Sequence, residues 1–177
     1  MDWLSIKEFL KDTLKYIILI VTILFIVIYV VSLHQIVGTS MTPTLNNGDI
    51  TILDKISYKF NNIKRNDIVS IYNEDSKYIV KRIVGLPGES IEYKNNKLYI
   101  NGEEIKELYL ENQITEDFKL NEIGYEKIPE DMYFVLGDNR KDSLDSRDSS
   151  VGLINKSDIL GKVRFRIWPL NKISNLN

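Results

Sequence analysis

The chain has no cysteine and a single histidine, His34, among its 177 residues. Without cysteine it can form neither a disulfide framework nor a thiolate metal site. A histidine metal cluster, or a serine–histidine–aspartate triad, would have to be built on His34 alone. The formal net charge of −2 argues against a general nucleic-acid-binding protein, which would be basic. The composition therefore argues against a thiolate metal site and a nucleic-acid partner, and we expect neither a metal nor a cofactor.

Charged residues are missing from one long stretch, Tyr16–Leu33, in which only Thr22 and Ser32 fall outside the apolar and aromatic set. As an α-helix its 18 residues would span roughly 27 Å, close to the thickness of a bilayer core. A strand so long and so uniformly apolar would have no polar face to present to water. We therefore predict a transmembrane helix at residues 16–33.

Lysine residues lie on one side of this stretch only. Lys7, Lys11 and Lys15 precede it, whereas the next lysine or arginine after it is Lys55. The positive-inside rule then predicts a single-pass protein of the cell membrane, with a cytoplasmic N-terminus and residues 34–177 outside.

Two alternatives compete with the anchor. A cleaved secretory signal would have a shorter apolar stretch and a small-x-small cleavage site, but His-Gln-Ile-Val follows Leu33. The other alternative is a buried core helix. Residues 1–15, which mix charged and apolar positions, predict an amphipathic lead-in at the membrane face.

Residues 34–177 lack helical periodicity and consist of short β-branched segments bounded by Asn, Asp and Gly. Asn95-Asn96 predicts a tight hairpin, and the acidic residues 103–128 predict a surface excursion with a short helix at 104–111. The expected fold is a mostly β domain, an antiparallel sheet or barrel, large enough to hold a core. Strands are predicted at 49–56, 66–72, 77–84, 90–95, 97–101, 132–137 and 159–168.

The first segment with chemical potential is GTSMTPTL, residues 38–45. Gly38 lets the backbone approach a ligand closely, Pro43 fixes a bend and Thr44 can cap it. Ser40, presented in this setting, is a candidate nucleophile. The alternative is an ordinary polar loop.

The second segment is YIVKRIVGLPGE, residues 78–89. Strand alternation puts Lys81 and Arg82 on opposite faces, so at least one cation lies near apolar surroundings. Burial lowers the pKa of a lysine, and a neutral amine can take a proton from a serine hydroxyl. The alternative is that Lys81 extends to water while Arg82 pairs with an acid.

The third segment is GDNRKDSLDSR, residues 137–147, a loop of charged residues and two serines. Its aspartate spacing does not match a helical calcium loop. A hydroxyl and paired charges in this loop could hold a lysine amine in place.

Together these segments resemble the bacterial type I signal peptidases, membrane-bound serine proteases with a Ser-Lys dyad. The resemblance covers almost the whole chain and includes the apolar N-terminal stretch, NGDI at 47–50, RNDIV at 65–69 and KRIVGLPGE at 81–89. With Gly38 two residues before Ser40, the chain resembles the Gram-positive branch of the family, because some other members place a hydroxyl at that position.

The resemblance implies that Ser40 attacks the scissile carbonyl, that Lys81 is its general base, and that Ser143 orients the Lys81 amine. The implied substrates are exported preproteins with small side chains at the first and third positions before the cut. Membrane lipid and the nearby translocation machinery are the implied partners. The implied supporting residues are the pairs Asp145–Arg147 and Asp138–Arg82 and, for the oxyanion, the backbone at Gly38 and Ser40.

Three other readings remain. Self-cleaving repressors share such a dyad but would need a DNA-binding N-terminus and no anchor. Endoplasmic-reticulum-type signal peptidases use histidine as the base, but His34 precedes Ser40, and we expect it at the membrane interface. A non-catalytic anchored β module would require neither Ser40 nor Lys81.

Overall fold

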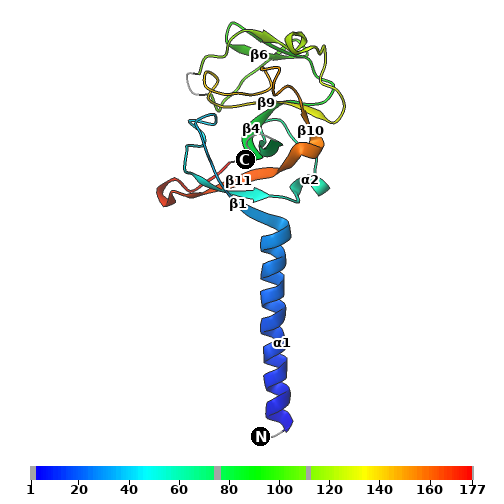
Figure 1. Ribbon diagram of the computed structural model, residues 1–177, viewed down its shortest axis with the longest axis vertical. Coiled ribbons are helices and arrows are strands. Elements are labelled where there is room, and N and C mark those ends of the chain that lie inside the picture. The colour runs from blue at the N-terminus through cyan, green and yellow to red at the C-terminus, as the bar shows by residue number, and fades with distance from the viewer. Residues whose placement is uncertain (1–2, 74–76, 111–112, 177) are drawn as a thin grey trace.

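One long helix projects from a β domain in the computed structural model, which describes residues 3–73, 77–110 and 113–176 (Figure 1). Helix α1 (Trp3–Phe25) continues as one π-helical segment, η1 (Ile26–Val30), and then becomes strand β1 (Val31–Gln35) without a linker. Within the described ranges, Ser5–Val30 is the one helix long and apolar enough to cross a membrane, with a mean hydropathy of 2.5.

The side chains of this helix do not pack against the β domain, so the alternative of a buried core helix is wrong. The expected span, 16–33, is helical only as far as Val30. Its last three residues pair instead with a neighbouring strand, because Leu33 lies opposite Ile52 in an antiparallel ladder. Residues 1–2 of the expected lead-in lie outside the described residues.

The β domain has two sheets, and every strand pairing among the described residues is antiparallel. The eight-stranded sheet has the order β1-β2-β11-β3-β4-β9-β10, with β12 paired to β11, and the other sheet has the order β7-β6-β5-β8. In Figure 1 the larger sheet lies next to the helix and the smaller one lies farthest from it. The strands are β2 (Ile50–Asp54), β3 (Ile68–Asn73), β4 (Lys77–Gly85), β5 (Ile91–Lys94), β6 (Lys97–Ile100), β7 (Glu103–Ile105), β8 (Phe118–Lys119), β9 (Met132–Leu136), β10 (Ile154–Asn155), β11 (Ile159–Trp168) and β12 (Ser174–Asn175).

Short helices complete the domain: α2 (Ser57–Phe60), η2 (Leu120–Ile123), η3 (Lys156–Asp158) and η4 (Leu170–Lys172). The prediction of a mostly antiparallel β domain behind one apolar helix is confirmed.

All seven predicted strands are present, and the Asn95-Asn96 hairpin is confirmed by the φ angles of 50° and 61° at its two residues. The predicted helix at 104–111 is wrong. Residues 103–105 form β7 instead, where Ile105 pairs with Leu98 on β6, and residues 106–110 are not helical. Residue 111 lies outside the described residues.

Strand β4 lies at the centre of the core because its side chains enter three separate apolar clusters. Val80 packs against one cluster and Ile83 belongs to a second. Val84 belongs to the third, which is built from strands of both sheets. The strand that carries Lys81 is therefore fixed on both of its faces.

Substitution of Phe134 tests the apolar cluster between the two sheets. Phe134 is fully buried, and its ring stacks on Phe118 with 5.5 Å between the ring centroids. We expect Phe134→Ala to lower the free energy of unfolding by about 3–5 kcal/mol through the cavity it creates. The exposed Tyr72→Ala should change it by less than about 0.5 kcal/mol. Urea unfolding of the detergent-solubilised chain measures both values, and equal effects would contradict this packing.

Candidate active site

Lys81 is a buried lysine on β4, with only 3% of its surface exposed. Its Nζ donates a hydrogen bond of 3.0 Å to Ser143 Oγ. Burial lowers the pKa of Lys81 to about 8, and this effect outweighs the nearby Asp145 carboxylate, which raises it. The amine therefore loses its proton at a much lower pH than an ordinary lysine, whose pKa is 10.5.

Ser40 lies in the turn that follows β1, and core residues hold that turn in place. Met41 and Leu45 are 1% and 0% exposed and belong to an apolar cluster of the large sheet. The Ser40 carbonyl accepts a hydrogen bond of 3.0 Å from the Asn139 backbone N–H. Neither the Ser40 hydroxyl nor its backbone N–H is bonded to another residue within the described part of the chain.

Ser40 and Lys81 line one cavity of about 490 Å³. One wall comes from residues 33–37, at the end of β1 and just beyond it, and another from residues 78–81 of β4. The cavity is lined mainly by apolar groups from these two strands. The structure thus brings the predicted nucleophile and the predicted base to the same site, although they are 41 residues apart in sequence.

Gly137 explains how Ser143 joins them. A Cβ atom at this position would overlap the Ser143 side chain and the Ser40 carbonyl oxygen. Only a glycine lets the backbone pass between these two groups. Ser143, Ser40 and the Lys81 amine are therefore gathered around this one point of close approach.

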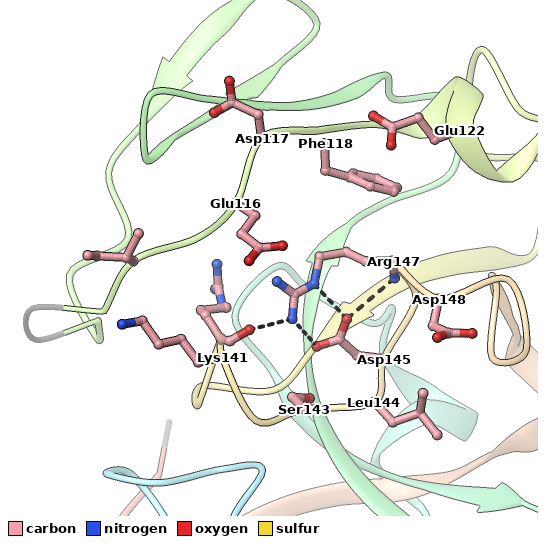
Figure 2. Close-up of a pocket in the computed structure, with 12 residues that line it drawn as sticks. Glu116, Asp117, Phe118, Glu122, Lys141, Ser143, Leu144, Asp145, Arg147 and Asp148 are labelled. Atoms are coloured by element: carbon pink, nitrogen blue, oxygen red, sulfur yellow. Dashed lines mark hydrogen bonds and ion pairs between the residues drawn. The ribbon is translucent and has the colours of Figure 1, made fainter.

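The loop at 137–147 is held by an internal ion pair. Arg147 donates to the two Asp145 carboxylate oxygens at 2.9 and 3.0 Å, and also to the Arg140 carbonyl at 2.8 Å. Asp145 in turn accepts from the Gly137 N–H at 3.1 Å. Figure 2 shows the Asp145–Arg147 pair beside a second cavity, of about 600 Å³, which Ser143 lines.

A second ion pair ties the loop to β4 and to the Ser40 turn. Arg82 donates to both Asp138 carboxylate oxygens, at 2.8 and 2.6 Å, and both side chains are buried. Thr44 donates to the same carboxylate, and Arg82 also donates to the Asn66 carbonyl at 3.0 Å. The two ion pairs expected from the resemblance, Asp145–Arg147 and Asp138–Arg82, are thus both present.

Gly38 is engaged in the turn. Its backbone N–H donates to Asn47 Oδ1 at 3.0 Å. This leaves Ser40 as the residue of the two whose N–H has no partner within the described ranges.

Two aromatic side chains line the cavity as well: His34, which the sequence predicts at the membrane interface, and Tyr78, which sequence reasoning missed. Their rings lie 5.4 Å apart, and His34 Nδ1 is 3.4 Å from the buried Ser70 hydroxyl. Burial, and to a lesser extent Lys55, lowers the pKa of His34. No local pattern could reveal this pair, because the two residues belong to strands that are not adjacent in the sheet. No group of three or more potential metal ligands occurs in the part of the chain that the structure describes.

Comparison with known families decides what this arrangement belongs to. Residues 7–168, from the apolar helix to the end of β11, match the family described as "Signal peptidase, peptidase S26". The chain belongs to this family. It is therefore a serine endopeptidase, and the family reaction is the removal of signal peptides from preproteins.

Individual relatives agree. The chain is 40% identical over 156 residues to signal peptidase I of Bacillus caldolyticus, covering 83% of this chain and 85% of the relative. It is 38% identical to signal peptidase I P of Bacillus subtilis subsp. natto, over 94% of both chains. A crystal structure of a signal peptidase I from Enterococcus faecalis V583 has a TM-score of 0.53 and 36% identity, covering 58% of this chain and 97% of that one.

Gly137 gives a direct test of the geometry. We expect Gly137→Ala to lower preprotein cleavage by more than about tenfold, because the new methyl group displaces Ser143 or the Ser40 turn. Cleavage of a preprotein in detergent measures the effect, and thermal unfolding shows whether the fold is retained. Unchanged cleavage would contradict the close approach described here.

Proposed function

We propose that the protein cleaves signal peptides from exported preproteins with a Ser40–Lys81 dyad on the outer side of the cell membrane. The observation that carries this proposal is the buried Lys81 amine, hydrogen-bonded at 3.0 Å to Ser143, in the wall of the cavity that also contains Ser40. A desolvated amine with a pKa of about 8 is neutral in a large fraction of molecules at that pH, and it has the basicity this chemistry needs.

The reaction follows from these groups. The neutral Lys81 amine takes the proton of the Ser40 hydroxyl as Oγ bonds to the scissile carbonyl carbon. The resulting ammonium gives that proton to the leaving nitrogen as the peptide C–N bond breaks, which leaves an acyl ester on Ser40. Lys81 then deprotonates a water molecule that attacks the ester, which releases the signal peptide and restores the serine.

The surrounding residues have supporting roles in this scheme. The Ser40 N–H is the donor we assign to the oxyanion, since it has no partner within the described ranges. Ser143 orients the Lys81 amine. Asp145–Arg147 and Asp138–Arg82 hold the loop that carries Ser143.

The strand pattern suggests how a substrate binds. Strand β9 pairs with β4 only from Arg82 onward, so within the described ranges residues 78–81 keep one backbone edge for another chain. Strand β1 is the edge strand of the sheet and faces the same cavity. An extended preprotein segment would add to these edges as a strand. In keeping with the family resemblance, we propose that the substrate carries small side chains at the first and third positions before the cut.

The apolar helix supplies the membrane anchor in this proposal. At 26 residues, Ser5–Val30 spans roughly 39 Å as a helix, more than the hydrocarbon core of a bilayer. The lysines at its start place the N-terminus in the cytoplasm. The cavity begins at Leu33, so cleavage occurs at the lipid surface, near the translocation machinery. Enzyme and signal peptide then share one plane, which raises their effective concentration.

Substitution of the dyad tests the mechanism. We expect Ser40→Ala and Lys81→Met each to lower kcat by at least about 10³-fold, because each removes a group that acts in the transition state. Lys81→Met keeps an apolar stem and removes only the amine. Substitution of the exposed Ser149 or Lys94 by alanine provides a matched control. Full cleavage of a preprotein by either dyad variant would reject the assignment.

The pH dependence tests the protonation state. The neutral amine is the active form, so kcat/KM should rise with pH through about 8 and level off above it. Below pH 7 it should fall about tenfold per pH unit. A rise centred near the ordinary lysine value of 10.5 would contradict a desolvated base.

A further inference from the structure

The buried guanidinium of Arg140 connects the Ser143 loop to the acidic excursion at 103–128. It donates to both carboxylate oxygens of Glu107, at 2.7 and 3.3 Å. It also donates to the Tyr93 hydroxyl at 2.9 Å and to Thr115 Oγ1 at 3.1 Å. The Arg140 side chain is 0% exposed, so this charge depends on the Glu107 carboxylate for its compensation.

Tyr109, two residues after Glu107, reaches the other buried arginine. Its ring lies under the Arg82 guanidinium, 3.9 Å from the Cζ atom to the ring centroid. Its hydroxyl donates to the same Glu107 carboxylate at 2.7 Å. One short segment of the excursion thus contacts Arg140 on the loop and Arg82 on β4.

These two arginines fix the loop at several points around Ser143. Arg82 holds Asp138 next to Gly137, and Arg140 Nε donates to the Gly137 carbonyl at 3.0 Å. The Arg140 carbonyl accepts from Arg147 at 2.8 Å. The contacts lie on both sides of Ser143 in the sequence, so they determine where its hydroxyl meets the Lys81 amine.

We propose that Glu107 and Tyr109 are positioning residues for the dyad, acting through Arg140 and Arg82 on the loop that carries Ser143. This inference rests on the proposed Ser40–Lys81 mechanism. Neither residue lines the cavity that contains Ser40, so neither acts by binding substrate there.

A looser loop would change the pKa of Lys81, whereas a smaller folded fraction would not. Water would reach the Lys81 amine, and the pKa of Lys81 would rise toward its ordinary value because desolvation is the main cause of its lowering. The charged groups acting on this amine are Asp138, Asp145 and Arg147, and the titratable His34 and Tyr78 lie in the cavity wall.

The experiment compares full-length Glu107→Gln and Tyr109→Leu with the native chain in detergent, using one preprotein over a range of pH. We expect kcat to fall at least about fivefold with KM within about twofold, since positioning affects the chemical step. The rising limb should move to higher pH by at least about half a unit. Tyr109→Phe, which keeps the ring over Arg82, should recover most of the activity lost in Tyr109→Leu.

Matched controls are Glu104→Gln, which removes an exposed acid of β7 paired with Lys97, and Tyr99→Leu on β6 of the same sheet. Both should keep the native kcat and pH profile. Unchanged kcat in Glu107→Gln and Tyr109→Leu would overturn the inference. Loss of activity with an unmoved limb, explained by a smaller folded fraction, would also overturn it.

Ser40→Ala in the same assay separates this inference from the mechanism beneath it. If Ser40→Ala cleaves normally, the dyad itself is wrong. If Ser40→Ala is inactive while Glu107→Gln and Tyr109→Leu behave as the native chain does, only the positioning role is wrong.

Discussion

The site depends on a buried cation that has no carboxylate partner. Arg82, Arg140 and Lys81 are all at most 5% exposed, and each arginine is paired with an acid. Among the described residues the Lys81 amine instead bonds to a hydroxyl, which compensates a positive charge poorly. Loss of the proton therefore costs less free energy for this buried amine than for a lysine in water. The nearby carboxylates of Asp138 and Asp145 remain unavailable to it, because Arg82 and Arg147 occupy them.

The two arginine pairs therefore do more than hold a loop. An aspartate released from its arginine would be free to pair with the Lys81 amine and stabilise the charged form, which the proposed mechanism requires it to lose. A small domain achieves this separation with side chains from three places: the turn after β1, strand β4 and the loop after β9. The apolar clusters on both faces of β4 hold these three segments in place relative to one another. The packing of the core therefore affects the pKa of Lys81.

Much of this architecture follows from local sequence. Alternation and turn residues predict the strands and the Asn95-Asn96 hairpin, and the apolar strand at 77–84 predicts that at least one of Lys81 and Arg82 lies in apolar surroundings. The end of the helix does not follow, because residues 31–33 contain no charged residue, glycine or proline that would end it, and only pairing with β2 makes them a strand. The excursion at 103–128 does not follow either: its acidic residues predict a surface segment with a short helix, yet Glu107 pairs with the buried Arg140, 33 positions later. Two residues that pair so far apart in the sequence produce no periodic pattern from which the pair could be predicted.

The direct passage from helix to strand at Val30 makes the protein sensitive to rotational register. With no flexible spacer, the rotation of the helix about its axis in the proposed membrane-anchored state sets the direction in which the cavity that contains Ser40 opens. Adding one residue to the helix would turn the whole β domain by about 100° about the helix axis while lifting it only about 1.5 Å. A change in helix length therefore alters the orientation of the β domain much more than its distance from the bilayer.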